Sequence, residues 1–490
     1  MERPLETVRV KNRPRLRTIE SEAGERHASW LELFFDLVFV LAVAQVAKIL
    51  AENSDLGGAL KYAALFVPVW WAWIGYTFYA DRFETEEATY RVLMFSGMLS
   101  VAAMALCLGG TFSSAGDIPF IVSYALVRGV LIALYIRAAY YVPLARSYCL
   151  HFIKYFGLAI GLWLFSLFLP PPVRYFVCGA AVLLELAAPL LNTRRVLDLP
   201  FDRSHIPERF GLFSIIVLGE AVIATANGAS QTVWTVSTVV VAAIGFAMAS
   251  AIWWINFDFV EDSAIKSRSL FPRFIYLYGH FFIVASIVAV GIGVEHAIKE
   301  TSGEHLHFPT LMLLGGGIAV YLTTIMVIKI VSENCTLFYA RIFSIAVSVW
   351  MIYAGGILPP LPSIAIFFFI LAGTVWLENR FGEETATDEP EHFGPCEHAG
   401  EMRIFKPRSV EGCEECIKNN YKWIHLRLCL SCGHVGCCDT SVYKHATKHF
   451  HAEAHPVIAS LEPNENWAWC YVDERFVPLI QPLGGEEREA

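Results

Sequence analysis

The chain has 490 residues, of which 56% are hydrophobic and only 17% are charged. This composition is too apolar for a single soluble domain and is typical of a polytopic membrane protein. The formal net charge of −9 argues against nucleic acid as a partner. Eight of the twelve cysteines fall between Cys396 and Cys470, so we expect the C-terminal part to have a chemistry of its own.

The first 29 residues hold seven Lys or Arg and no apolar core of the signal-peptide type, which predicts a basic cytosolic segment. The apolar run from Trp30 to Ala47 follows and carries Glu32 and Asp36 at helical i, i+4 spacing. Acids in a membrane helix are costly to expose to lipid. We therefore expect this pair to face the protein interior or a water-filled path.

About twelve segments are apolar over roughly the 20 residues that a membrane-spanning helix needs. They predict an all-α polytopic membrane protein, with ten to twelve spans as the range. The segments are 30–51, 62–80, 92–112, 118–142, 151–169, 173–192, 210–227, 233–256, 272–298, 309–330, 339–358 and 362–378.

The distribution of basic residues predicts the orientation of these spans. With the N-terminus in the cytoplasm, twenty-two Lys and Arg fall in the inner loops and their flanks, and only four fall outside. The four are Lys48, Lys61, Arg174 and Lys299. Such an excess of positive charge inside indicates an even number of spans with both termini cytoplasmic.

An internal similarity suggests two six-helix repeats, residues 30–192 and 193–380. Trp70-Trp71 recurs as Trp253-Trp254 at an offset of 183, and Asp36 falls opposite Glu220 at an offset of 184. Single matches between apolar helices can arise by chance, but a near-constant offset over several helices favours duplication. Transporter folds commonly use such repeats and place their sites between the halves.

Four polar residues of the spans are candidates for transport or for a polar cavity: Glu32, Asp36, Arg82 and Glu220. Two interpretations remain open. In one, the charges form structural ion pairs, with Arg82 holding Asp36 and Arg209 holding Glu32. In the other, the acids form a cation or proton path in a cavity shared by the two halves. Catalysis is the weakest reading, because the spans contain no nucleophile or metal signature.

Other polar and aromatic side chains also occur within the spans. Arg128, Glu185 and His280 each stand alone among apolar neighbours within a span. The cluster of Trp70, Trp71 and Trp73 predicts packing or an interfacial belt rather than a ligand cage.

The membrane part resembles the bacterial low temperature requirement A family. The resemblance rests on WLELFFDLVFVLAVAQ, WWAWIGYTFYADRF and ERFGLFSIIVLGEAVIA, which occur in this order within about residues 25 to 380. It implies a multi-pass protein of the bacterial inner membrane and does not imply a substrate.

After Arg380 the sequence changes abruptly. Residues 381–395 form an acidic stretch with Gly and Pro, which is typical of a flexible linker. Residues 396–478 then contain Cys-x-x-Cys pairs and downstream histidines, a pattern that predicts a small α+β zinc-binding domain. Disulfides are disfavoured if this part is cytosolic. A tail of residues 479–490 completes the chain.

This module resembles the zinc finger of ubiquitin-specific proteases, with LCLSCGHVGCC, HATKH and WCYVDE as the matching stretches. The resemblance implies two zinc ions. One site would use Cys413, Cys416, His445 and either Cys437 or Cys438, and the second would use Cys429, Cys432, His449 and His455. A third site would use Cys396, His398 and Cys470, where Asp473 replaces the family's last cysteine.

The resemblance also implies a pocket with aromatic walls for the carboxylate of a ubiquitin tail. Trp423, Trp469 and Tyr471 match these walls, but Asp439 stands where the family has an Arg. An acid there would repel a carboxylate, so a ubiquitin tail is disfavoured and a basic or neutral chain terminus is the better expectation.

Taken together, these patterns predict a transporter- or channel-like protein with a cytosolic zinc module that senses or docks a protein or peptide. The alternative is a membrane-anchored adaptor whose spans serve only as a scaffold. Lipid is a partner in either case. The substrate and the oligomeric state are not encoded in any motif of the chain.

Overall fold

The computed structural model describes two compact units, one formed by Met1–Ile19 with Arg26–Glu383 and the other by Glu20–Glu25 with Glu384–Ala490. The described residues of the first unit are 14–16, 28–84, 87–113, 116–191, 205–259, 270–332 and 337–381. Those of the second are 396, 398, 402, 406–409, 412–419, 421–439, 441–462, 467–473 and 475–477. Most of the predicted basic N-terminal segment, nearly all of the acidic linker and the C-terminal tail lie outside these ranges.

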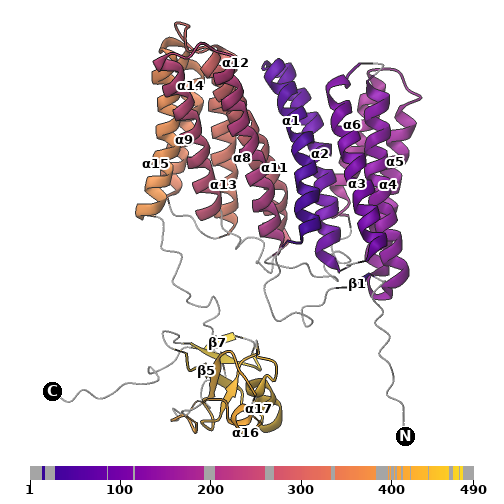
Figure 1. Ribbon diagram of the computed structural model, residues 1–490, viewed down its shortest axis with the longest axis vertical. Helices are drawn as coiled ribbons and strands as arrows, with labels where there is room; N and C mark the ends of the chain where they lie inside the picture. The colour runs from indigo at the N-terminus through magenta and orange to yellow at the C-terminus, as the bar shows by residue number, and fades with distance from the viewer. Residues whose placement is uncertain are drawn as a thin grey trace, which may run out of the picture. The chain divides into compact units, whose positions relative to one another are not determined.

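Helices account for almost all of the described residues of the first unit (Figure 1). The N-terminal half contains α1 (Trp30–Glu52), α2 (Leu56–Arg82), α3 (Ala88–Cys107), α4 (Asp117–Tyr141), α5 (Arg146–Ser166) and α6 (Val173–Ala187). The C-terminal half contains α8 (His205–Ser230), α9 (Val236–Asp258), α11 (Leu270–Lys299), α12 (Phe308–Leu311), α13 (Gly317–Val331), α14 (Phe338–Ala354) and α15 (Pro360–Phe381). Five π-helical residues, Met312–Gly316, join α12 to α13 into one continuous rod. Two short strands, β1 (Arg15–Leu16) and β2 (Phe83–Glu84), pair antiparallel.

Ten of these helical segments are long and apolar enough to cross a membrane. The two predicted spans that fall short do so for physical reasons. Helix α6 has 15 residues, which at about 1.5 Å per residue is shorter than the roughly 30 Å of a hydrocarbon core. Helix α2 is long enough but carries three Trp and three Tyr, which lower its hydropathy. The expected count of twelve spans is thus met only in part.

Helix α2 is enclosed over most of its length. Every residue from Val69 to Thr77 is buried, as expected for a helix that is apolar all round and lies inside a bundle. Helix α1 packs one face on it, because buried side chains recur every three or four residues from Phe35 to Leu50. Glu32 and Asp36 continue this buried face, as the sequence predicts.

The two halves of the unit meet where α1 and α2 contact α8, and α1 also contacts α11. Close approach in the second half depends on glycine. A Cβ added to Gly291 of α11 would lie 2.7 Å from the Cα atom of Ala221 in α8. The separation is therefore too small for any larger residue. No repeat relation between the halves is established by this packing.

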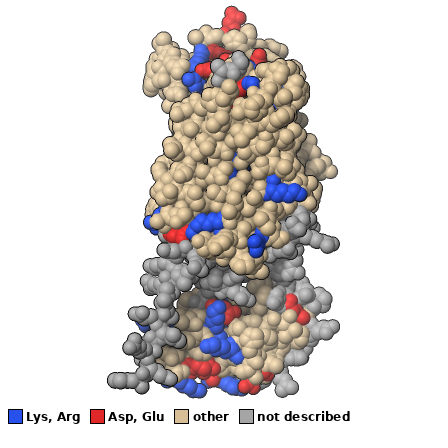
Figure 2. All heavy atoms as spheres, turned by 90° about the vertical axis from the view of Figure 1, so that its right-hand side faces the viewer, with Lys and Arg blue, Asp and Glu red and all other residues tan. Residues whose placement is uncertain are grey.

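The outer surface of the helical unit fits a bilayer. Figure 2 shows one face on which charged side chains gather near both ends, with an almost uncharged band between them. Large apolar side chains such as Leu99, Leu106 and Phe369 are exposed along the helices. Lipid is the solvent that such a surface requires, and the protein is accordingly a multi-pass membrane protein.

The second unit contains a five-stranded antiparallel sheet in the order β4-β3-β5-β6-β7. Its strands are β3 (Leu426–Cys429), β4 (Val435–Cys437), β5 (Val457–Ser460), β6 (Ala468–Cys470) and β7 (Arg475–Val477). Two short helices, α16 (Glu414–Lys418) and α17 (His445–Glu453), accompany the sheet. This unit has a small apolar core that includes Leu428, Val457 and Ala468, and it is the expected α+β module.

Candidate functional sites

A buried cluster of charges joins the two halves of the membrane part. Arg209 of α8 donates from Nη2 to Oδ1 of Asp36 at 2.7 Å, and its Nη1 lies 3.7 Å from Oε2 of Glu32. The indole nitrogen of Trp73 donates to the same Asp36 oxygen at 2.7 Å. All four residues are at most 4% exposed. Helix α1 thus supplies two acids, and α2 and α8 supply their donors.

His205 at the start of α8 extends this cluster. Its Nε2 lies 3.0 Å from Oε2 of Glu32, and its Nδ1 lies 3.1 Å from Oδ1 of Asp81 in α2. Both His205 and Asp81 are buried. In these contacts Glu32 and Asp36 share the guanidinium of Arg209, and Glu32 and Asp81 share the imidazole of His205.

The structure separates the pairings that the sequence had left open. Arg209 contacts Glu32, as expected if the charges form structural ion pairs. It also makes a closer contact to Asp36, for which that interpretation expected Arg82 as the partner. Arg82 donates to the Phe78 carbonyl at 3.3 Å and lies over the ring of Tyr148. Trp73 is buried and hydrogen-bonded to a carboxylate, so it belongs to the charge cluster and not to an interfacial belt.

Glu220 lies apart from this cluster. It is half-buried and sits eleven residues beyond Arg209, roughly 16 Å along the axis of α8. Eleven residues are close to three full turns, so both residues occupy the same face of the helix. Nothing in the described contacts places Glu220 beside Asp36 in one cavity.

Three further ion pairs are structural in character. Arg128 of α4 pairs with Glu185 of α6, and Glu185 also accepts from the hydroxyl of Tyr124 at 2.7 Å. Glu378 of α15 binds Lys329 at 3.0 Å and Arg341. Neither Arg128 nor Glu185 is isolated, although each stands among apolar neighbours in its own helix. His280 is also satisfied, because its Nδ1 lies 2.8 Å from the Tyr276 carbonyl.

The cysteines and histidines of the second unit converge in three groups whose ligand atoms lie within 4.8 Å of one another. The first consists of Cys413, Cys416, Cys437 and His445. Nδ1 of His445 lies 3.2, 3.3 and 3.4 Å from the three sulfurs. A tetrahedral zinc with its usual bond lengths has S–N edges of about 3.6 Å, so the residues fit this ion. Cys438 is outside the group.

The second group consists of Cys429, Cys432, His449 and His455. Nε2 of His449 lies 3.3 Å from the sulfur of Cys432 and 3.2 Å from Nδ1 of His455. These separations also suit zinc. His445 and His449 are one turn apart on α17, yet each joins a different group.

The third group joins Cys396, His398 and Cys470 to Asp473. Oδ2 of Asp473 lies 3.1 Å from Nδ1 of His398 and 3.8 Å from the sulfur of Cys470. The carboxylate therefore stands where a fourth ligand is needed, and carboxylate oxygen is an accepted zinc ligand. The two Cys-x-x-Cys pairs and this mixed set suggest zinc, without fixing the number of ions.

Sequence reasoning missed the residues that link the first two groups. Nε2 of His434 lies 2.7 Å from Oε1 of Glu415, and the His434 ring stacks on His449 at 4.1 Å. Glu415 stands between Cys413 and Cys416 in the sequence, where the spacing alone could have drawn attention to it. Partners of metal ligands commonly fix the orientation of the ligand ring.

The three residues expected to form an aromatic pocket have different neighbours. Trp423 packs on the first cysteine group, above Gly412, whose φ of 145° only glycine readily adopts. Trp469 packs edge-on against Phe476 at 4.9 Å. Tyr471 stacks on Phe450 at 4.8 Å, and burial raises its pKa to about 12.

Asp439 borders the Tyr471 side of this unit. It is exposed and accepts a hydrogen bond from the hydroxyl of Thr447. The Thr447 hydroxyl lies 3.1 Å from that of Tyr471. The side chains of Tyr471, Thr447 and Asp439 thus form a short polar row that ends in the exposed carboxylate of Asp439.

Comparisons with known proteins agree with a membrane part followed by a zinc-binding unit. The family model "Bacterial low temperature requirement A protein (LtrA)" matches residues 27–376. The model "Zn-finger in ubiquitin-hydrolases and other protein" matches residues 413–481. An uncharacterised protein of Rhizobium meliloti is 28% identical over 365 residues, which cover 67% of this chain and 86% of that protein.

Two further matches concern only the second unit. Ubiquitin carboxyl-terminal hydrolase 44 of Ailuropoda melanoleuca is 34% identical over 87 residues, 17% of this chain and 11% of that enzyme. The solution NMR structure of a protein from Rhodopseudomonas palustris is 47% identical and covers 19% of this chain and 95% of that one, with a TM-score of 0.16.

Proposed function

Because the chain belongs to the bacterial low temperature requirement A family of membrane proteins, we propose that its spans move protons or small cations and that its zinc finger docks a cytosolic partner. The observation that carries the first part is the buried cluster of Glu32, Asp36, Asp81, His205 and Arg209. A scaffold has no need of three buried carboxylates gathered beside one guanidinium and one imidazole, since charges are costly to bury in a membrane.

The chemistry of the cluster suits proton transfer. Histidine is the side chain that most readily gains and loses a proton near neutral pH, and His205 stands between Glu32 and Asp81 at hydrogen-bonding distance from each. Protonation of the imidazole strengthens its contacts with Glu32 and Asp81, and loss of that proton weakens both. Arg209 would keep Asp36 in place during this exchange.

Two further acids, one in α8 and one in the neighbouring α11, lie beyond this cluster. Glu220 lies roughly 16 Å beyond Arg209, and Glu295 of α11 lies beside Gly228, a further eight residues or roughly 12 Å. The total of about 28 Å approaches the hydrocarbon thickness of a bilayer. We therefore assign Asp36, Glu220 and Glu295 as successive stations of the path, rather than as members of one cavity.

The proposal includes an orientation and a location. The excess of basic residues in alternate loops supports cytoplasmic termini in the bacterial inner membrane, with twelve helices in two related halves. Several of these basic residues, including Arg194 and Lys266, lie outside the described residues.

The second unit would bind zinc through its three groups of ligands and use the bound ions to hold its fold. Its exposed Asp439 favours a basic or neutral partner over the carboxylate of a ubiquitin tail. The alternative, an adaptor whose spans only anchor the finger, keeps this docking role and removes the transport.

Flux in liposomes separates the two functions. We expect full-length protein in liposomes with a potassium diffusion potential to carry protons or sodium ions, and a chain ending at Phe381 to retain that flux. Absence of flux for every ion tested, together with a stable partner in pull-downs, would favour the adaptor.

A further inference from the structure

A slot in the N-terminal half of the membrane part is independent of the charge cluster. It lies between α2, α4, α5 and α6 and has a volume of about 350 Å³. This is within the range of about 300–1,000 Å³ in which proteins bind small ligands. Most of its lining is apolar, with Leu65, Ile121, Trp163 and Leu183 among the contributors.

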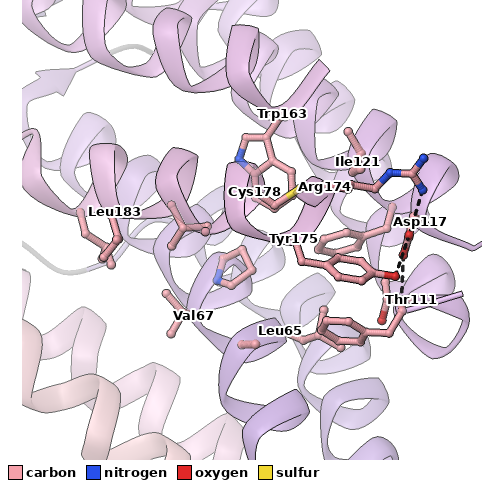
Figure 3. Close-up of a pocket in the computed structure, with 17 residues that line it drawn as sticks. Leu65, Val67, Thr111, Asp117, Ile121, Trp163, Arg174, Tyr175, Cys178 and Leu183 are labelled. Carbon is pink, nitrogen blue, oxygen red and sulfur yellow. Dashed lines mark hydrogen bonds and ion pairs between the residues drawn. The ribbon is translucent and has the colours of Figure 1, made fainter. Parts of the chain in front are cut away.

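One end of the slot is polar. Figure 3 shows Leu183 at the apolar end and the pair Asp117–Arg174 at the other. Nη1 of Arg174 donates to Oδ2 of Asp117 at 3.0 Å, and the hydroxyl of Tyr175 donates to the same oxygen at 3.2 Å. Oδ1 of Asp117 accepts from the backbone nitrogen of Phe112 at 2.9 Å. The arrangement holds Arg174 at the slot's mouth with its charge balanced.

The length of the slot matches one leaflet of a membrane. Along α6 its lining extends from Arg174 to Leu186, which is roughly 18 Å at 1.5 Å per residue. Half of a hydrocarbon core is about 15 Å. The polar end lies where α4 and α6 begin, at the end of the helical bundle, so the apolar part extends toward the bilayer centre.

The slot is also accessible from the side. Leu183 is 66% exposed and Gly179 is exposed, and in a membrane both positions face hydrocarbon. A Cβ added to Gly179 would have no atom within 4 Å. The absence of a side chain at this position therefore keeps the lateral face of the slot open.

We propose that the slot binds a single hydrocarbon chain of an amphipathic lipid, with its oxygen-bearing head group at Arg174. The Nη1 and Nε donors of Arg174 are occupied, by Asp117 and by the Ser166 carbonyl at 3.4 Å. The two hydrogens of Nη2 and the second hydrogen of Nη1 are left to meet a head-group oxygen. A carboxylate of a free fatty acid and a phosphate of a phospholipid offer the same chemistry.

Photocrosslinking identifies the occupant. Full-length protein would be reconstituted with palmitic acid that carries a diazirine on its chain, or with phosphatidylglycerol that carries the same chain. We expect peptides from residues 174–186 to be labelled by at least one probe, and the productive probe identifies the source. Gly179→Leu should reduce that labelling at least fivefold by filling the slot.

The control is Gly157→Leu, the same substitution at an exposed glycine of α5 that also has no atom within 4 Å of an added Cβ and does not line the slot. Its labelling should equal that of the wild type. Val182→Phe provides a second way to fill the slot if Gly179→Leu does not fold. Labelling by neither probe, or labelling that both filled variants leave unchanged, would overturn the proposal.

Discussion

Asp36 and Glu185 are both buried carboxylates that face an arginine, yet their surroundings differ. Glu185 contacts the guanidinium of Arg128 and the hydroxyl of Tyr124, and these two partners also contact each other. Asp36 shares Arg209 with Glu32, which in turn contacts His205 and, through it, Asp81. The arrangement around Glu185 is that of a structural ion pair. In the cluster around Asp36, the titratable side chain of His205 connects Glu32 to Asp81.

The role of Arg209 in stability can be measured against Arg128. Removing one partner of a buried ion pair leaves the other charge uncompensated and typically costs about 3–5 kcal/mol. We expect Arg209→Gln and Arg128→Gln each to lower the unfolding temperature in detergent by a similar amount. Asp36→Asn should cost much less, because asparagine still accepts from Trp73 and Arg209 retains Glu32. If Asp36→Asn were as unstable as Arg209→Gln, the role of Asp36 would be only to stabilise the fold.

Asp439 provides a test of partner charge. Peptides that end in Gly-Gly with a free carboxylate should bind the full-length protein negligibly, since Asp439 repels them. Asp439→Arg should improve that binding at least tenfold by calorimetry if the aromatic residues form walls around this site, whereas Asp439→Asn should give a smaller gain. Micromolar binding by the unmodified protein would contradict the assignment of this position.

Part of the residue-level chemistry was predictable from the sequence. The i, i+4 spacing of Glu32 and Asp36 places them on one buried face, and local pattern is enough for that inference. Their partners are 173 positions away in α8, and tertiary packing alone decides that Arg209 rather than Arg82 reaches Asp36. His205 and Asp81 lie at helix ends, where polar residues are common, so the sequence does not indicate that these two belong to a site.

Elements of the second unit are defined by their ligands as much as by their strands. Cys429 ends β3, Cys437 ends β4 and Cys470 ends β6, so each metal group ties a strand end to a helix or loop. The apolar core is small, and structural zinc commonly supplies much of the folding free energy of such domains. Spacing predicted a zinc-binding module, and the resemblance to the ubiquitin-protease zinc finger implied the three groups, with Cys437 and Cys438 left as alternatives because they are adjacent.

Zinc content tests this reading at the level of single cysteines. The protein should hold two zinc ions tightly and a third weakly, and a chelator should abolish the sheet signal of the second unit. Cys437→Ser should lose one tightly bound ion by elemental mass spectrometry. Cys438→Ser is the matched control and should retain both, and loss of zinc from it would show that the first group is wrongly assigned.

The helices show which elements hydropathy can identify. Ten segments are apolar and long enough to be recognised by composition alone. Helix α2 is the most enclosed of the first half, yet its tryptophans and tyrosines weaken the signal that reveals the others. Aromatic side chains with one polar atom are suited to a protein interior where that atom finds a partner, as Trp73 does with Asp36.

Orientation belongs to the scale of the whole molecule. If both termini are cytoplasmic, single cysteines placed at Gly57 and Ser302 should react with an impermeant maleimide added outside intact cells. A cysteine at Ser263, or those of the C-terminal unit, should react only after lysis. Labelling of the C-terminal unit from outside would reverse the orientation and remove the basis for a cytosolic partner.

The central claim is that Asp36, Glu220 and Glu295 carry protons or cations across the membrane. The most direct measurement is flux through proteoliposomes containing wild type, Asp36→Asn, Glu220→Gln or the structural control Glu185→Gln, each normalised to correctly folded protein. The account predicts at least a tenfold loss for Asp36→Asn and Glu220→Gln, with flux near wild type for folded Glu185→Gln. Undiminished flux in both Asp36→Asn and Glu220→Gln would contradict it.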